Sequence, residues 1–231
     1  MKPTFVLVHS PSVGPLTWQP VAERLGAAGY RVRVPSLLHV GRGAPPFWPR
    51  VVSAVRDDLA PVPADSPLVL VVHSNAGLFL PTLRTGIDHP VAASVFVDAA
   101  LPARRGPTPV APPELLEFLR PMAVHGRLPR WTDWWDEADV APMFSDPALR
   151  QRVVAEQPRL PLSYYEQRIP VPDAWEDHPC SYLLFGPPYE EAAAEARDRG
   201  WRVGHLPGAH LHQIVDPDGT ARHLVELAGE S

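Results

Sequence analysis

The sequence has 231 residues, of which 45% are hydrophobic, so it is long enough to bury the core of one α/β domain. The formal net charge is −5 and the charges are interspersed, which gives no reason to expect nucleic acid or an anionic membrane as a partner. The single cysteine, Cys180, excludes a disulfide within the chain, and the 10 histidines show no spacing typical of metal ligands.

Short apolar runs alternate with helical stretches along the chain. Continuous apolar or β-branched character predicts the strands, and capping or breaking residues separate them from the helices. In chain order the predicted strands are residues 4–9, 31–35, 68–73, 93–98, 181–186 and 202–206, and the predicted helices are residues 18–28, 47–59, 76–85, 190–200 and 220–228. This alternation predicts βαβ units, and hence a mainly parallel six-stranded sheet flanked by helices, in a single α/β domain over residues 1–231.

Residues 102–179 interrupt the alternation. Prolines and tryptophans are dense there, and the segment is too long for a plain loop, so we expect an insertion with short helices of its own. The apolar run near the N-terminus is too short for a signal-peptide core, and no run approaches the length of a membrane span. We therefore expect a cytoplasmic protein with a small-molecule partner and no membrane contact, and a homodimer stays open.

The run VHSNAG, residues 72–77, carries the strongest chemical signal. A buried strand ends at His73 and a helix begins after Asn75, so Ser74 lies at a sharp strand-to-helix turn. This run resembles the nucleophile elbow of the α/β-hydrolase family, usually G-x-S-x-G, with Val72 where the first glycine is usual. The resemblance implies that Ser74 is a nucleophile; the alternative is a serine that only caps the helix.

A candidate base follows the last predicted strand, in the run LPGAHLH over residues 206–212. The family usually carries its catalytic histidine on this loop after a Pro-Gly-x sequence, which favours His210. His212 is the second choice, and His205 lies within the strand. An imidazole on this loop can fold back over the sheet edge and take the serine proton.

The position of the candidate acid departs from the usual pattern of the family. The family usually places it after the strand at residues 181–186, but Tyr189 stands at the usual spacing, and Glu190 opens a helix where acids are favoured anyway. Some family members, haloalkane dehalogenases among them, carry the acid at an earlier strand end, where this chain has Asp98. We predict Asp98 as the acid that orients His210, with Glu190 as the alternative.

The loop after the first strand reads HSPSVGP, residues 9–15, where the family usually shows His-Gly-x and donates an amide to the oxyanion. Pro11 has no N–H to donate. The resemblance therefore implies an oxyanion hole formed by the amide of Asn75 and by a second donor, which is Ser12, through its amide or hydroxyl, or else Ser10.

The insertion at residues 102–179 matches the family's cap region, which usually covers the nucleophile. It is rich in aromatic residues, which either line an apolar substrate pocket or form the small core of the cap itself. We expect the substrate contacts to come from Ser10, Trp131, Trp134, Trp135 and Tyr164.

Three functions fit the sequence. The first is a serine hydrolase that cleaves an ester or thioester of a small apolar or aromatic substrate through an acyl-enzyme on Ser74, with no cofactor. The second is a non-hydrolytic enzyme of the same fold, such as a hydroxynitrile-lyase-like lyase or a biosynthetic cyclase. The third is a receptor-like member that binds a ligand without turnover.

Overall fold

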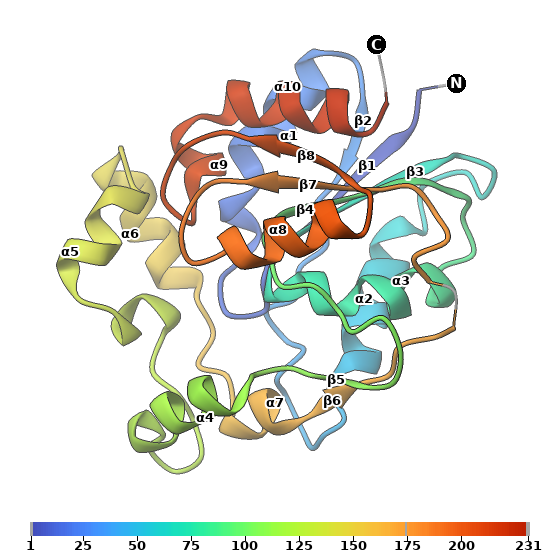
Figure 1. Ribbon diagram of the computed structural model, residues 1–231. Coiled ribbons are helices and arrows are strands. Elements are labelled where there is room, and N and C mark those ends of the chain that lie inside the picture. Colours follow the sequence, from blue (N-terminus) through green and yellow to red (C-terminus); the bar gives the residue numbers. More distant parts are fainter. Residues whose placement is uncertain (1, 174, 230–231) are drawn as a thin grey trace.

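The computed structural model describes residues 2–173 and 175–229, and its centre is a six-stranded sheet (Figure 1). The strand order is β2-β1-β3-β4-β7-β8, and all neighbouring strands are parallel. The strands are β1 Thr4–Val8, β2 Arg31–Arg33, β3 Leu68–Ser74, β4 Val91–Ala99, β7 Cys180–Leu184 and β8 Arg202–His205. The predicted sheet is thus confirmed.

Helices cover both faces of this sheet, which explains why its central strands are apolar throughout. Helices α1 (Gln19–Ala27) and α10 (Pro217–Leu227) lie on one face, where Phe5 and Leu7 of β1 point. Helices α2 (Trp48–Leu59), α3 (Leu80–Gly86) and α8 (Glu190–Asp198) lie on the other.

Two predicted helices differ from the observed ones for reasons of local chemistry. Residues 75–86 form a 3₁₀ turn, η2 (Asn75–Phe79), followed by α3, and Pro81, which has no amide hydrogen, stands at the start of α3. Near the C-terminus, α9 (His212–Val215) was not expected. Helix α10 begins at Pro217 rather than at residue 220, because the Asp216 side chain accepts a hydrogen bond from the Gly219 amide at 2.8 Å.

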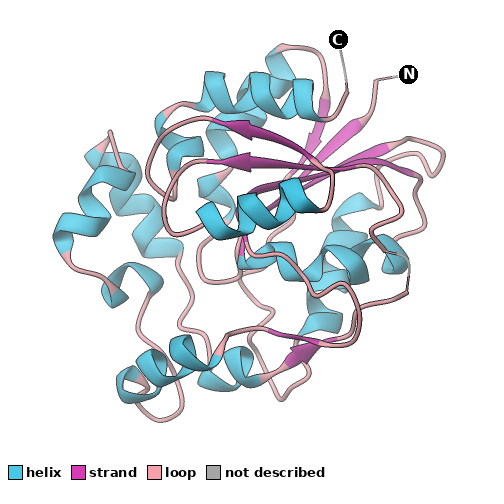
Figure 2. Ribbon diagram, in the orientation of Figure 1, coloured by secondary structure: helices cyan, strands magenta, loops and turns pink. Residues whose placement is uncertain are grey.

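The chain between β4 and β7 forms short helices and a two-stranded antiparallel sheet (Figure 2). It lies at the left and lower side of Figure 1, and β7 and β8 point toward its left-hand part. Its elements are β5 Thr108–Pro109, α4 Pro113–Leu119, η3 Arg120–Met122, η4 Trp131–Trp134, α5 Glu137–Val140, η5 Ala141–Met143, α6 Pro147–Glu156, α7 Leu162–Glu166 and β6 Arg168–Ile169. One further 3₁₀ turn, η1 Pro15–Thr17, precedes α1.

The chain turns sharply after β3, and glycine is required there. A Cβ atom on Gly77 would collide with the carbonyl oxygen of Ala100, just beyond the end of β4. At this close approach the ends of β3 and β4 lie together: Ser74 pairs with Ala99, the last residue of β4, and the Ala100 amide donates to the Ser74 carbonyl oxygen at 3.1 Å. No helix among the described residues is long and apolar enough to cross a bilayer.

Candidate active site

Ser74 is the last residue of β3, and its backbone adopts φ 59° and ψ −132°. Residues with a β-carbon rarely occupy this region, and such strain persists only where the surroundings hold it. Val72, which replaces the usual glycine, is fully buried and packs on the α2–α3 side of the sheet. The turn therefore forms without the first glycine.

His210 meets Ser74 at the carboxyl edge of the sheet. Its Nε2 lies 2.9 Å from Ser74 Oγ, although 136 positions separate the two residues in the sequence. The other candidates lie elsewhere: His205 is exposed in β8, and the His212 ring packs against Phe185. Of the three histidines that the sequence offered, the structure brings His210 to the serine.

Asp98 completes the chain of hydrogen bonds. Its Oδ2 accepts from His210 Nδ1 at 2.6 Å, and its Oδ1 accepts from the Phe185 amide at 3.0 Å. Asp98 is fully buried near the end of β4, with φ 42°. Glu190, the alternative acid, is exposed at the first position of α8.

Two buried histidines that the sequence did not single out fix the surroundings. His73 donates a hydrogen bond from Nε2 to the His210 carbonyl oxygen at 2.9 Å, and the two rings stack 4.6 Å apart. His9 bridges Ser10 and Leu37, since its Nδ1 donates to the Ser10 carbonyl oxygen at 2.8 Å and its Nε2 accepts from the Leu37 amide at 3.0 Å. Burial lowers the pKa of His9 to about 4 and holds the pKa of His73 well below its usual value, so both rings are neutral.

The loop after β1 lies beside Ser74. The Ser12 hydroxyl shares a 2.6 Å hydrogen bond with the Tyr165 hydroxyl, and the Ser12 amide lies 3.4 Å from Ser10 Oγ. The side chain of Asn75 is tied elsewhere, because it accepts from Tyr164 at 2.6 Å and donates to the Val110 carbonyl oxygen at 3.1 Å. The side chain of Asn75 is thus occupied by these two partners, which leaves its backbone amide as the expected donor at Ser74.

A cavity of about 640 Å³ opens over Ser74 and His210. Its wall is mostly apolar and comes from the segment between β4 and β7 and from the loop after β7. Ser10, Trp131, Trp134 and Trp135 line it, as we expected, but Tyr164 does not. That expectation is corrected: Tyr164 is fully buried behind the wall, where it holds Asn75, and its neighbour Tyr165 faces the cavity.

Tyr189 is the residue that sequence reasoning left unassigned. Its hydroxyl lies 3.3 Å from Ser74 Oγ, and its ring stacks on His210 at 5.0 Å with an interplanar angle of 16°. The available signal was its place, since it stands where the family usually has the acid. Because a phenol cannot replace a carboxylate as the acid, that place alone did not point to a role for Tyr189.

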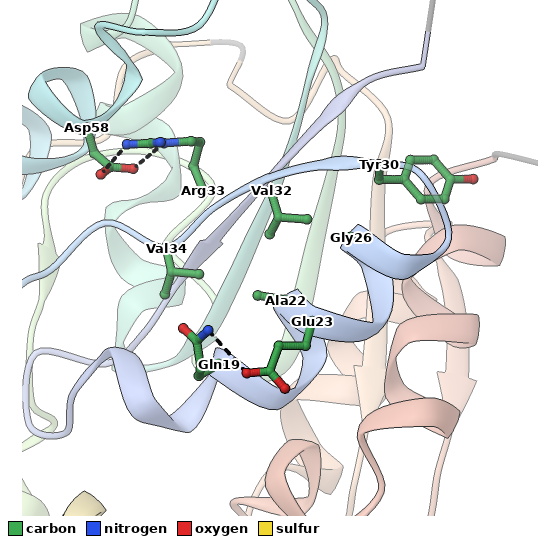
Figure 3. A pocket seen from close by; sticks show the side chains of 9 residues that line it. All are labelled: Gln19, Ala22, Glu23, Gly26, Tyr30, Val32, Arg33, Val34 and Asp58. Atoms are coloured by element: carbon green, nitrogen blue, oxygen red, sulfur yellow. Dashed lines mark hydrogen bonds and ion pairs between the residues drawn. The ribbon is translucent and has the colours of Figure 1, made fainter.

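A second hollow, of about 460 Å³, lies between α1 and the edge strand β2 (Figure 3). Arg33 donates twice to Asp58 there, at 3.0 and 2.8 Å, and Glu23 accepts a hydrogen bond from Gln19 at 3.4 Å. None of the nine described residues that line it is a serine, threonine, cysteine or histidine. It therefore lacks the groups for nucleophilic catalysis that gather around Ser74.

The comparisons with known proteins agree with this architecture. A family model described as "Alpha/beta hydrolase family" matches residues 5–223. The chain belongs to the α/β hydrolase family. No curated protein matches the sequence. Within the described residues, no group of three histidine, cysteine, aspartate or glutamate side chains is arranged to hold a metal ion.

Solved structures with the same fold include esterases and other hydrolases. An extracellular α/β-hydrolase from a Paenibacillus species has a TM-score of 0.75 at 20% identity, over 97% of this chain and 98% of that one. A polyneuridine aldehyde esterase variant has a TM-score of 0.73 at 14% identity, over 98% and 99% of the two chains. A pyrethroid hydrolase has a TM-score of 0.69 at 18% identity, over 99% and 98%. At such low identities these likenesses establish the fold of this chain and nothing more.

Proposed function

We propose that this protein is a serine hydrolase that cleaves neutral carboxylic esters or thioesters bearing a small apolar or aromatic group, through an acyl-enzyme on Ser74. The observation that carries the proposal is the unbroken chain of hydrogen bonds from Ser74 to His210 to Asp98, at 2.9 and 2.6 Å. Because Asp98 accepts a hydrogen bond from the Nδ1–H group of His210, Nε2 of His210 is free to accept the serine proton.

The proposed reaction has two halves. Ser74 Oγ attacks the carbonyl carbon while its proton passes to His210 Nε2, and the tetrahedral intermediate collapses when the leaving group takes that proton. Water then attacks the acyl-enzyme, with His210 again as the base, and the acid product leaves. The side chain of Asp98 keeps its hydrogen bond to Nδ1 and stabilises the imidazolium in both halves.

The oxyanion is proposed to rest near Ser10 and Ser12, where a cavity of about 10 Å³ adjoins Ser74. This is room for about one oxygen-sized atom. We expect its donors to be the Asn75 amide and a group of Ser12, because Pro11 has no amide hydrogen. The loss of one such donor costs about 3 kcal/mol of transition-state stabilisation.

The substrate class is proposed from the wall of the large cavity. Three tryptophans and Leu115 make it apolar, and among its described residues Asp139 is the only aspartate or glutamate, with no lysine or arginine. With no cation to pair with a carboxylate or a phosphate at this wall, a neutral substrate fits best.

Hydrolysis of p-nitrophenyl butyrate in ¹⁸O-labelled water tests the proposal. We expect turnover that Ser74→Ala abolishes, with one labelled oxygen in each butyrate released. If the folded wild-type protein turns over no ester, or if Ser74→Ala retains the wild-type rate, the proposal is wrong. If the protein instead converts a substrate to a product that contains no ¹⁸O from the water, the result would favour a lyase or a cyclase.

A further inference from the structure

We propose that Tyr189 is a further catalytic residue, whose hydroxyl donates a hydrogen bond to Ser74 Oγ and stabilises that oxygen as it leaves the acyl group during deacylation. The inference rests on the proposed function. It begins from the 3.3 Å separation between the Tyr189 and Ser74 oxygens.

The direction of this hydrogen bond follows from the rest of the chain. Asp98 is an acceptor, so the proton of the His210–Asp98 bond lies on Nδ1, and Nε2 is then the acceptor for the Ser74 proton. Since the only hydrogen of the Ser74 hydroxyl is used in this bond, Tyr189 must be the donor in the remaining one. Burial raises the pKa of the Tyr189 phenol to about 12, so the donor proton is present at neutral pH.

The position of Tyr189 is fixed by its surroundings. Its amide donates to the Gly186 carbonyl oxygen at 3.1 Å, and its own carbonyl oxygen accepts from the Ala193 amide at 3.0 Å at the start of α8. Its ring lies nearly parallel to that of His210. The phenol is therefore held at the serine by both its backbone and its ring.

The loop after β7 does not supply the candidate acid, but it makes two other contacts at this site. In place of an acid, it supplies the Phe185 amide that binds Asp98 and the phenol that reaches Ser74. The acid itself comes from the end of β4. A neutral donor suits this place, because a second carboxylate beside Asp98 would repel it.

The chemistry decides which half-reaction benefits. In acylation, Oγ gives an electron pair to the carbonyl carbon. A hydrogen bond donated to Oγ therefore does not become stronger as the new bond forms, and it does not lower the barrier. In deacylation, water adds to the acyl carbon, and then the bond from carbon to Oγ breaks. The electron pair returns to Oγ, which takes the proton from His210 Nε2, and the Tyr189 hydrogen bond strengthens as the charge on Oγ grows.

The test measures the two halves separately with p-nitrophenyl trimethylacetate, whose hindered acyl group leaves slowly. The burst of p-nitrophenol in a stopped-flow experiment gives acylation, and the loss of the acyl mass from gel-filtered protein gives deacylation. For Tyr189→Phe, which keeps the ring, we expect deacylation about tenfold slower and acylation within about twofold of the wild type. Tyr30→Phe, which removes a hydroxyl beside β2, is the matched control and should change neither rate.

Two results would overturn this inference and leave the proposed function standing. One is deacylation at the wild-type rate in a Tyr189→Phe protein. The other is equal slowing of acylation and deacylation, which would indicate displaced packing. Should Tyr189→Phe fold poorly, 3-fluorotyrosine at residue 189 strengthens the donor and should speed deacylation; an unchanged or slower rate counts against the inference. If the wild-type protein forms no acyl-enzyme with this probe, the proposed function fails, and the inference fails with it.

Discussion

At the scale of single residues, the backbone conformation of Ser74 leads us to predict the relative stabilities of two variants at this position. Its φ of 59° with ψ −132° is strained for any residue with a β-carbon. Ser74→Gly and Ser74→Ala both lack the hydroxyl and differ in this strain. We expect Ser74→Gly to be the more stable of the two by about 1–2 kcal/mol, the reverse of the usual order. Thermal unfolding of both variants measures this, and a more stable alanine variant would show that the turn is relaxed.

The choice of Asp98 over Glu190 makes a second prediction. Asp98→Asn keeps the shape of the side chain but favours the wrong tautomer of His210, so we expect kcat for p-nitrophenyl butyrate to fall by about 10⁴-fold. Glu190→Gln is the matched control, because Glu190 is exposed at the start of α8. Loss of activity in Glu190→Gln, with activity kept in Asp98→Asn, would reverse the assignment.

The sequence predicts that Ser74, His210 and Asp98 lie close together, because each lies at or just beyond the C-terminal end of a predicted strand and such ends meet at one edge of a parallel sheet. It does not identify Tyr189 or assign tasks to His9 and His73, since their partners are backbone atoms or distant side chains whose contacts exist only after folding. Tyr164 shows the opposite error. An aromatic residue in a loop-rich segment can face a cavity or lie behind its wall. In α7 these two places are taken by consecutive residues, since Tyr165 faces the cavity and Tyr164 lies behind it.

At the scale of elements, the loop after β1 depends on His9. Its neutral ring joins the end of β1 to Leu37, and a protonated ring could not accept the Leu37 amide. Because the pKa of His9 is lowered to about 4 in the folded state, the unfolded chain binds the proton first as the pH falls below 6.5. The contribution of the neutral His9 ring to the free energy of unfolding is therefore fully present above pH 6.5, and it is lost as the pH falls toward 4.

The size of this effect can be measured. Between pH 7 and pH 5, we expect His9 to remove about 2 kcal/mol from the free energy of unfolding. His9→Gln offers both a donor and an acceptor but does not titrate, so its free energy of unfolding should fall by about that much less over this interval. Urea denaturation at both pH values measures the difference. Equal losses in the two proteins would mean that His9 is not held neutral by the fold.

The order and type of the main elements follow from apolar periodicity together with the capping and breaking residues between them. The exceptions have local causes, such as Pro81 at the start of α3 and the Asp216 side chain at the start of α10. The pairing of β5 with β6 lies beyond reach of the sequence, because two-residue strands carry no periodicity.

At the scale of the whole molecule, the cavity between the sheet edge and the segment that follows β4 predicts a substrate preference. Each added methylene of an acyl chain should bury against the tryptophans and contribute about 0.8 kcal/mol, or roughly fourfold in kcat/KM, until the cavity is full. A series of p-nitrophenyl esters measures this. A half-ester of succinate, which matches the length of a pentanoyl group but is anionic, should react more slowly than the pentanoate. A flat series, or preference for the anion, would contradict the proposed substrate class.

The central claim is that the Ser74 hydroxyl, activated by His210, is the nucleophile. The most direct measurement is the intact mass of the protein after treatment with a fluorophosphonate probe, followed by peptide mapping. We predict one adduct per chain, on Ser74, that is absent in Ser74→Ala and formed far more slowly in His210→Ala. A well-folded wild-type protein with no adduct, or with an adduct on another residue, would contradict the claim.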